Sequence, residues 1–328
     1  AIGVDVGGTF TDVALSVDGD LVTAKVPSTD DQSEGVAAGI EKACEAAGVD
    51  PESVTEFSHA MTVSVNALLE GDGAKTALVT TEGFRDVLEI GRQTRPSLYD
   101  LDAEKPAPLV PRRRRFEVPE RATADGVERP VEDEAIDSLV ADLRDADVES
   151  VAVCLLHAYA HPENEERVAE ALRDALDVPV SASHEVLPEF REYERTSTTV
   201  VDAYVRPAID GYVGRLTERA RDLGLPQPKI MQANGGVTDA GTVRRNAVTT
   251  VLSGPAAGVV GASATAGADA DREGLITFDM GGTSSDVSLV RDGEVERTTE
   301  SAIADRPIGT PMVDVETVGA GGGSIAWV

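Results

Sequence analysis

A short motif occurs twice in this chain, and it constrains the fold more than any other feature. Residues 5–15 read DVGGTFTDVAL, and residues 279–289 read DMGGTSSDVSL. The two copies stay in register at a spacing of 274 residues, and nine of the fifteen positions from 5 to 19 are identical to their counterparts. Self-similarity at a fixed spacing indicates one structural unit that is used twice.

Each copy predicts the same local structure. An apolar run, at 2–6 and again at 275–280, indicates a buried strand, and Gly-Gly-Thr after it indicates a tight turn. A second strand is expected at 12–17 and at 286–291. An Asp-Gly pair follows each second strand and is a strong hairpin signal. The unit is therefore strand, glycine-rich turn, strand, Asp-Gly turn and strand.

The glycine-rich turn suggests a chemistry as well as a shape. Glycines let backbone N–H groups approach a ligand closely, and successive N–H groups in a turn form a nest for an anion such as phosphate. The aspartates that precede the two turns, Asp5 and Asp279, can hold a magnesium ion through water. A single such turn is usually only a hairpin. Two in register predict a pair of phosphate-binding hairpins, which suits a nucleoside triphosphate with magnesium.

Between the two copies, helical and strand patterns alternate, which predicts an α/β sheet with covered faces. Residues 94–130 interrupt this pattern and are expected to form a long surface excursion. Its run of four arginines, 112–115, is interpreted as solvated or paired with local acids. The expected helices are 33–47, 131–146, 162–176 and a longer one from about 188 to 223 in which Pro207 marks a kink or boundary, and the expected strands are 74–80, 151–157, 177–182 and 228–233.

The charge of the chain excludes one class of partner. With 59 acidic and 29 basic residues the formal net charge is −30, which would repel a nucleic-acid backbone. Only five of the basic residues are lysines, a composition that resembles proteins of halophiles. Molar salt screens such self-repulsion, because the Debye length is about 3 Å at 1 M. The alternative is an ordinary acidic protein.

Cysteine usage and hydropathy indicate the compartment. Cys44 and Cys154 are too few for a disulfide framework and lie in apolar stretches, so both are expected in the core. No window holds 18 apolar residues, so no membrane partner is expected. The N-terminus lacks a basic region that would begin a signal peptide. A cytoplasmic location is therefore predicted.

Beyond the two hairpins, the chain resembles the hydantoinase A / 5-oxoprolinase family, within the actin/sugar-kinase ATPase superfamily. The resemblance implies two α/β domains of the ribonuclease-H-like type on either side of a nucleotide cleft, at 1–190 and 191–328. The chain ends four residues after the glycine-rich run 318–324, so the second domain is expected to be incomplete and the chain truncated. The stretches that carry the resemblance are GVDVGGTFTD (3–12), KVPST (25–29), GFRDVLEIGRQTRPSLYDL (83–101), EYERTSTTVVDAYVRP (192–207), SGPAAGVVGA (253–262), FDMGGTSSDVSLV (278–290) and VGAGGGSIA (318–326).

The resemblance also implies a site for ATP and Mg²⁺. Asp5 and Asp279 would be catalytic and would hold the metal. His59 would be a third catalytic residue on a substrate-side loop, although Ala60 and Met61 depart from the family's His-Gly-Thr-Thr pattern and a structural role at a helix start is the alternative. The expected nucleotide-binding residues are Gly7, Gly8, Thr9, Thr11, Asp12, Gly281, Gly282, Thr283, Ser284, Asp286, Gly321 and Gly322.

The activity implied by the resemblance is ATP-dependent hydrolytic opening of a cyclic amide, such as hydantoin, N-methylhydantoin or 5-oxoproline. ATP would phosphorylate the ring carbonyl, and water would then open the ring. A hydantoinase B-type partner subunit is expected, a homo-oligomer is left open, and the truncated chain is expected to be weakly active or inactive alone. The alternatives are an ATP-using subunit of an acetone or acetophenone carboxylase and a non-catalytic nucleotide-binding sensor.

Overall fold

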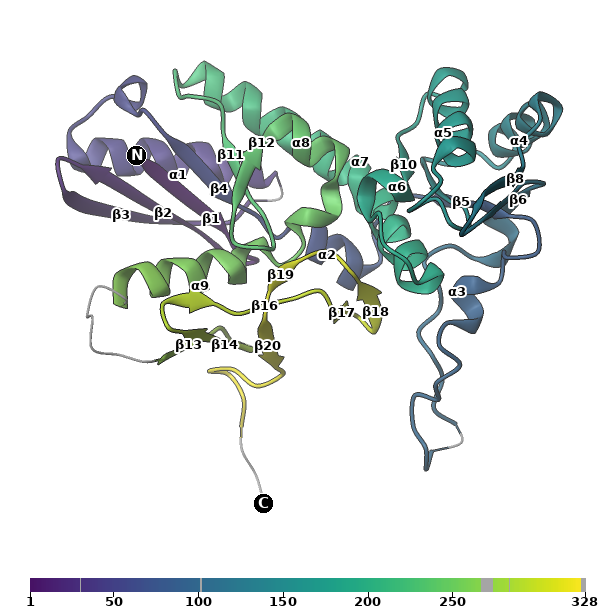
Figure 1. Cartoon of the computed structure of the whole chain (residues 1–328). Helices are drawn as coiled ribbons and strands as arrows, with labels where there is room; N and C mark the ends of the chain where they lie inside the picture. Colours follow the sequence, from purple (N-terminus) through teal and green to yellow (C-terminus); the bar gives the residue numbers. More distant parts are fainter. Residues whose placement is uncertain (30, 101, 267–273, 283, 326–328) are drawn as a thin grey trace.

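The duplicated hairpins belong to two different sheets in the computed structural model, which describes residues 1–29, 31–100, 102–266, 274–282 and 284–325 (Figure 1). The first hairpin lies in a six-stranded sheet with the order β12-β11-β4-β1-β2-β3. Strands β1, β2 and β3 are antiparallel, whereas β4 and β11 run parallel to β1. The bounds are β1 (Ile2–Val6), β2 (Phe10–Val17), β3 (Asp20–Pro27), β4 (Phe57–Ala60), β11 (Lys229–Met231) and β12 (Val237–Asp239).

Helix α1 (Gln32–Ala47) covers one face of this sheet. Asp31 caps its start by accepting a hydrogen bond from the Ser33 N–H, and Gly48 ends it in the left-handed conformation. The helix buries an apolar stripe that includes Val36, Ile40 and Ala43. These residues share one hydrophobic core with the buried side chains of β1 and β2.

A separate four-stranded parallel sheet has the order β10-β9-β5-β6. Helices α4 (Asp133–Asp145) and α5 (Glu163–Ala175) pack on it through a second hydrophobic core. Strand β6 comes from the segment expected to be a surface excursion, so that expectation was wrong for these residues. The strands are β5 (Thr76–Thr81), β6 (Arg115–Val118), β9 (Ser150–Cys154) and β10 (Val180–Ala182).

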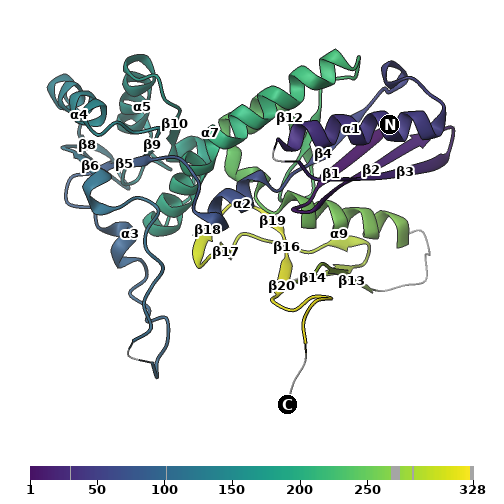
Figure 2. The ribbon, with the colours of Figure 1, turned by 180° about the vertical axis from the view of Figure 1, so that it is seen from behind.

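The long helix α7 (Glu192–Asp222) connects these two sheets. It contacts β9 near its start and α1 and α2 (Val63–Glu70) further along, and it runs between the two halves of the molecule (Figure 2). Pro207 lies inside this helix, so it is not the boundary that the sequence suggested. Strands β11 and β12 follow α7 and complete the first sheet. The six-stranded sheet therefore contains strands from both sides of the predicted domain boundary at 190/191. The two domains, 1–190 and 191–328, stay a prediction.

The second hairpin forms the centre of a third sheet, in which β13 (Gly274–Met280) pairs with β14 (Ser285–Arg291). Strand β14 also pairs with β15 (Glu294–Val295) and with β20 (Val315–Val318). Helix α9 (Ser253–Ala266) lies between this sheet and the first one (Figure 1). The remaining elements are α3 (Val87–Ile90), α6 (Ser183–Val186), α8 (Ala240–Arg245), β7 (Arg121–Thr123), β8 (Gly126–Arg129), β16 (Arg297–Thr298), β17 (Ser301–Ile303), β18 (Arg306–Ile308), β19 (Met312–Val313) and the 3-10 turns Pro51–Ser53, Arg112–Arg114 and Ala247–Thr250.

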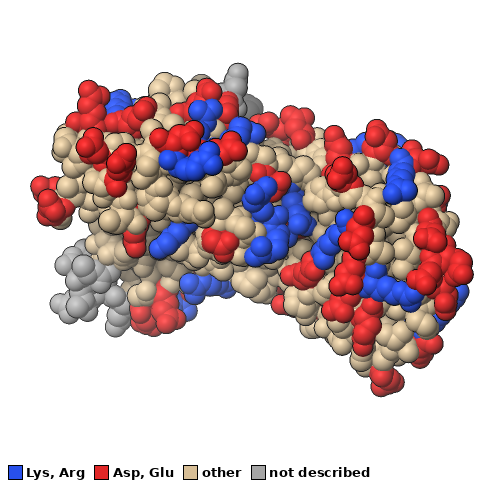
Figure 3. Space-filling model, turned by 90° about the horizontal axis from the view of Figure 1, so that it is seen from above, with Lys and Arg blue, Asp and Glu red and all other residues tan. Residues whose placement is uncertain are grey.

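The charged residues are distributed as mixed patches rather than one basic surface. Figure 3 shows acidic side chains interspersed with basic ones over the face seen from above. Within the arginine run, Arg112 pairs with Asp86 at 2.9 Å, and the buried Arg115 pairs with Glu89 at 2.9 Å, which confirms the pairing with local acids. Cys44 and Cys154 are buried free thiols, as expected. Within the described ranges, no helix is both long enough and apolar enough to cross a membrane.

Candidate nucleotide site

The two hairpins have the same backbone arrangement. Asp5 is paired with Asp12 in the first, and Asp279 is paired with Asp286 in the second. Each turn is closed by an equivalent hydrogen bond of 2.9 Å, from the Gly7 N–H to the Phe10 carbonyl and from the Gly281 N–H to the Ser284 carbonyl. The repeat seen in the sequence is therefore a repeat of structure. Thr283, expected to bind nucleotide, lies outside the described residues.

Both turns leave space for a ligand at the second glycine. A Cβ atom added at Gly8 or at Gly282 would meet no other atom within 4 Å. Gly8 and Thr9 are exposed, as are Gly281 and Gly282. The backbone of both turns is therefore accessible to a phosphate group.

Each turn is held in place by a neighbouring segment. Ser28, at the end of the KVPST stretch, donates from its hydroxyl to the Gly7 carbonyl (2.8 Å) and from its N–H to the Thr9 carbonyl (2.9 Å). At the second turn, the N–H groups of Gly322 and Gly323 donate to the carbonyls of Gly281 and Gly282, both at 2.9 Å. These contacts place the predicted residues Gly321 and Gly322 beside the second hairpin.

The aspartate carboxylates of the two hairpins are close enough to influence one another. The pKa of Asp5 is raised, first by the desolvation that the surrounding protein imposes on this partly exposed side chain, and then by repulsion from Asp12 and Asp279. Lys25 opposes this effect, and its ammonium group lies 2.7 Å from Asp12. A carboxyl group whose pKa is raised by burial and by neighbouring carboxylates, as that of Asp5 is, is common in functional sites.

Helix α9 begins next to Asp5. A Cβ atom on Gly254 would lie 3.4 Å from the Asp5 Oδ1 atom. The hydroxyl of the buried Ser253 donates to the Met61 carbonyl at 3.0 Å, which fixes the start of the helix against the segment that follows β4. The first N–H groups of a helix favour an anion. The site therefore combines two glycine turns, a helix N-terminus and carboxylates that can bind a cation.

The donor set fits magnesium bound together with nucleotide phosphates. In such sites the ion takes one or two protein carboxylates, phosphate oxygens and water, rather than a complete protein cage. The described part of the chain brings together no group of three or more His, Cys, Asp or Glu side chains that could hold a metal ion. Asp5 and Asp279 are the residues that would contribute carboxylates.

Three of the predicted nucleotide-binding side chains are either buried or paired with other residues. Thr11 is fully buried beneath α1, where a Cβ atom on Gly35 would lie 3.2 Å from its hydroxyl. Asp12 pairs with Lys25, and Asp286 accepts a hydrogen bond from the Thr317 hydroxyl at 2.7 Å. Thr11 therefore supports the hairpin from behind, and the two aspartates are tied to neighbouring strands.

His59 is not brought together with the hairpin carboxylates. It lies beside Val4 in the sheet, whereas Ala60 lies beside Asp5. Because successive side chains of a strand point to opposite faces, His59 is on the face opposite to Asp5. Its side chain is buried, and its Nε2 atom lies 2.7 Å from the Tyr212 hydroxyl on α7. This position fits the structural alternative, and its catalytic role stays a prediction without geometric support.

A titration of the histidine ring protons by NMR checks this position. Burial lowers the pKa of His59 to about 4. The partial burial of His184 lowers its pKa as well, but the neighbouring Glu165 carboxylate outweighs this effect, and the pKa of His184 is raised overall. We expect the His59 signals to remain those of a neutral ring from pH 7.5 to pH 5.5, and the His184 signals to titrate above pH 6.5.

The effects of these two groups on stability have opposite signs. Because the pKa of His59 is lowered in the folded chain, stability is lost as the pH falls from about 6.5 towards 4. The total loss is roughly 3 kcal/mol, since one pKa unit corresponds to about 1.36 kcal/mol. The raised pKa of His184 contributes stability at low pH that is lost as the pH rises through the folded value. A His59 signal with an ordinary midpoint near 6.5 would show that the ring is accessible to solvent.

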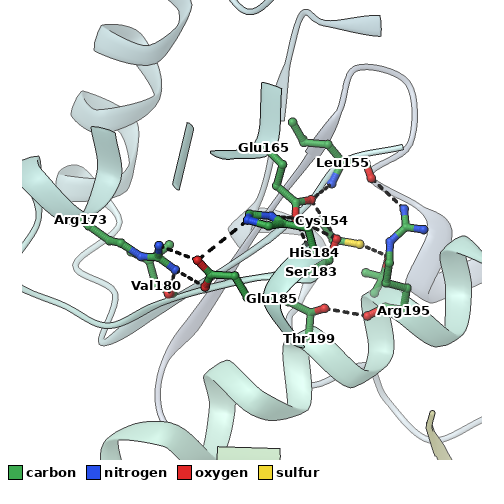
Figure 4. A network of polar contacts seen from close by, with 11 residues as sticks. Cys154, Leu155, Glu165, Arg173, Val180, Ser183, His184, Glu185, Arg195 and Thr199 are labelled. Carbon is green, nitrogen blue, oxygen red and sulfur yellow. Dashed lines mark hydrogen bonds and ion pairs between the residues drawn. The ribbon is translucent and has the colours of Figure 1, made fainter. Parts of the chain in front are cut away.

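The sequence reasoning missed a buried polar network between α5, β9 and α6 (Figure 4). The fully buried Glu165 carboxylate accepts hydrogen bonds from the Leu155 N–H (2.6 Å), the Ser183 hydroxyl (2.9 Å) and both the N–H and the Nδ1 of His184 (2.8 Å each). Nearby, the buried Arg195 donates to the Leu155 carbonyl at 2.7 Å. The network fixes the loop after β9, far along the chain from the hairpins.

A pocket of about 670 Å³ lies near the start of α7. Its lining includes Arg92 and Arg95, which belong to the stretch 83–101 that carries the family resemblance, and also Tyr193 and Arg306. Arg92 already makes a two-pronged ion pair with Glu194. Its guanidinium therefore supports the pocket wall.

Comparisons with known proteins show the family of this chain. The family model "Hydantoinase/oxoprolinase N-terminal region" matches residues 1–176, and "Hydantoinase/oxoprolinase" matches residues 195–328. The chain therefore belongs to the hydantoinase/oxoprolinase family.

Three proteins illustrate the relationship. Caprolactamase subunit alpha of Pseudomonas jessenii is 37% identical over 99% of this chain and 48% of its own length. The crystal structure of the ATP-dependent caprolactamase from the same organism matches with a TM-score of 0.89 at 36% identity. This match covers 100% of this chain and 49% of that one. The nucleotide-free structure of acetone carboxylase matches with a TM-score of 0.86 at 28% identity, covering 98% of this chain and 48% of that one. 5-Oxoprolinase 1 of Arabidopsis thaliana is 35% identical over 98% of this chain and 28% of its own length. The chain thus spans half or less of these relatives.

Proposed function

We propose that this chain forms the ATP-binding part of an enzyme that opens a cyclic amide by hydrolysis. The observation that carries the proposal is the pair of equivalent hairpins, whose carboxylates are near enough for Asp279 to raise the pKa of Asp5. ATP would supply the phosphoryl group that activates the amide carbonyl of the ring. The names of the caprolactamase and 5-oxoprolinase relatives support a lactam-type ring as the substrate class.

Each part of the site has a proposed role. The N–H groups around Gly8 and Gly282 bind phosphate oxygens, and the N-terminus of α9 adds further N–H donors. Asp5 and Asp279 hold Mg²⁺ and orient the reacting groups. Glycine N–H groups and the cation thereby provide local attraction for a polyphosphate in a chain of net charge −30.

A partner subunit is part of the proposal. The Pseudomonas jessenii relative is named as a subunit, and a hydantoinase B-type protein is the partner that we expect for this chain. A second function, ATP use in the carboxylation of a ketone, is favoured by the structural match to acetone carboxylase at a TM-score of 0.86. We place the enzyme in the cytoplasm.

Phosphate release from ATP tests the proposal and separates the two functions. The chain is assayed together with its partner subunit, with hydantoin, 5-oxoproline or caprolactam in one series and with acetone or acetophenone plus bicarbonate in the other. We expect stimulation by one of the rings. Stimulation only by ketone plus bicarbonate would favour the carboxylase function and contradict the hydrolase function. Bound ATP without stimulation in either series would leave a nucleotide-binding sensor and contradict the enzyme proposal.

A further inference from the structure

Asp202 is a fully buried carboxyl group on α7 to which the proposed function gives no role. Its Oδ1 atom accepts a hydrogen bond from the Val248 N–H at 2.8 Å, and its Oδ2 atom accepts one from the Ser181 hydroxyl at 2.6 Å. Burial raises the pKa of this carboxyl, and both hydrogen bonds oppose that effect. A buried polar group is unfavourable unless it is hydrogen-bonded, so these two partners are what keep Asp202 inside the protein.

The two partners belong to different parts of the molecule. Ser181 lies in β10, at the edge of the four-stranded sheet, whereas Val248 lies in the 3-10 turn that precedes α9. Arg206, one turn further along α7, makes the same connection. Its Nη1 donates to the Val180 carbonyl at 3.0 Å, and its Nε donates to the Arg244 carbonyl at 2.9 Å. This part of α7 therefore ties the segment before α9 to the four-stranded sheet.

The segment from Val248 to the start of α9 contains a strained residue. Leu252 directly precedes the helix and has a φ of 62°, in the left-handed region that a leucine seldom adopts. Such a conformation persists only where the surrounding structure fixes the backbone. Because the backbone passes from Leu252 straight into α9, whatever fixes this segment also fixes the first residues of the helix.

Other contacts hold the later part of the same segment. The Thr250 hydroxyl lies 3.0 Å from the Ser64 hydroxyl on α2, and the Ser253 hydroxyl donates to the Met61 carbonyl at 3.0 Å. Both contacts connect the segment to the part of the chain that follows β4. The beginning of the segment is held by a different element, α7, through the carboxylate of Asp202.

We propose that Asp202 is a positioning residue for the nucleotide site. Through the Val248 N–H it fixes the segment that leads into α9, and it thereby places the first residues of this helix beside Asp5. There, a Cβ atom on Gly254 would lie 3.4 Å from the Asp5 Oδ1 atom. The N–H groups at the start of the helix are the ones that favour a phosphate. The inference rests on the proposed function, because ATP is the ligand assigned to this helix start.

Substitutions of the carboxylate and of its second partner test this role in the 328-residue chain. Asp202→Ala removes the acceptor of the buried Val248 N–H, so the dissociation constant for Mg-ATP should rise by about tenfold or more at a temperature where the chain stays folded. Asp202→Asn keeps an acceptor oxygen at the same position and should restore most of the affinity. The matched control Ser181→Ala removes the other partner of the same carboxylate, leaves the Val248 contact and should retain nearly full affinity.

Hydrogen exchange without nucleotide gives a readout that does not depend on the ligand. The amides of 248–256 should exchange faster in Asp202→Ala than in Asp202→Asn or Ser181→Ala, while those of β1 and β2 exchange equally in all three. Asp202→Ser is a second variant without the contact, because its side chain is too short to reach Val248 and can bond to the helix backbone instead. It should behave as Asp202→Ala does.

The opposite results would overturn the positioning role. Asp202→Ala with the affinity of the unsubstituted chain would do so, as would equal losses in Asp202→Ala and Ser181→Ala, because the carboxylate would then act through general packing. Failure of both Asp202→Ala and Asp202→Ser to fold would make the residue a requirement of the fold and also overturn the role. If the unsubstituted chain binds no Mg-ATP, the proposed function fails, and the exchange over 248–256 still decides whether Asp202 fixes the start of α9.

Discussion

Replacing both Asp5 and Asp279 by asparagine is expected to weaken Mg-ATP binding by roughly 100-fold while leaving the fold intact. The substitution keeps the side-chain size and one oxygen, but it removes both negative charges that would hold the cation. Burial and repulsion from Asp12 and Asp279 both raise the pKa of Asp5, which means that its negative charge is unfavourable in the folded chain. Removing this charge should therefore not lower the unfolding midpoint. A change in binding without a loss of stability distinguishes a binding role from a structural one.

The pH dependence of binding gives an independent readout of Asp5. With a folded pKa above 3.8, the carboxylate is protonated earlier as the pH falls, so Mg-ATP affinity should decline at a higher pH than an ordinary aspartate would allow. Asp5→Asn alone should remove this decline.

The matched control is Asp18→Asn with Asp292→Asn. These equivalent residues occupy exposed turns at positive φ, which asparagine also tolerates. An equal loss of affinity in this control would contradict the assignment.

Glu165→Ala should lower the free energy of unfolding by about 3–5 kcal/mol. The carboxylate is fully buried, and its removal leaves the Leu155 N–H, the Ser183 hydroxyl and the His184 N–H without their acceptor. It would also leave a cavity beneath the loop after β9. Urea unfolding followed by far-UV circular dichroism measures the change.

The neighbouring residue supplies the control for this substitution. Glu166 is exposed, so Glu166→Ala should change the free energy of unfolding by no more than about 0.5 kcal/mol. Glu165→Gln, which keeps the volume and one acceptor oxygen, should fall between the two. A stability for Glu165→Ala close to that of Glu166→Ala would mean that the network is not a stabilising element. Mg-ATP binding at the distant hairpins should persist in every variant that folds.

The hairpins could be predicted in detail because their information is local. Gly-Gly-Thr, the flanking aspartates and the alternation of apolar residues all lie within about fifteen positions, and their repetition confirmed each interpretation. The registers that pair Asp5 with Asp12 and Asp279 with Asp286 follow from that local pattern. Helix α1 was also predicted closely, because Gly48 marks its end and the apolar stripe is regular.

The remaining features depend on contacts between distant segments. The side of the sheet on which His59 lies is decided by its pairing with Val4 and by Tyr212, which is 153 residues further along the chain. Glu165 reads as one more charge on an acidic helix until β9 and α6 are placed against it. Likewise, the apolar positions of β13 predict burial, and only the structure shows them exposed. In each case tertiary packing, not local propensity, decides the environment.

Calorimetric titration of the 328-residue chain with Mg-ATP, in parallel with Gly8→Val and Gly282→Val, tests the central claim most directly. A Cβ at either glycine meets no protein atom within 4 Å, and neither glycine has a positive φ, so these substitutions should not disturb the fold. We predict saturable binding of one Mg-ATP per chain, which either valine weakens at least tenfold at an unchanged unfolding midpoint. No binding by the unsubstituted chain, or binding that both valine variants retain in full, would contradict a nucleotide site built from the two hairpins.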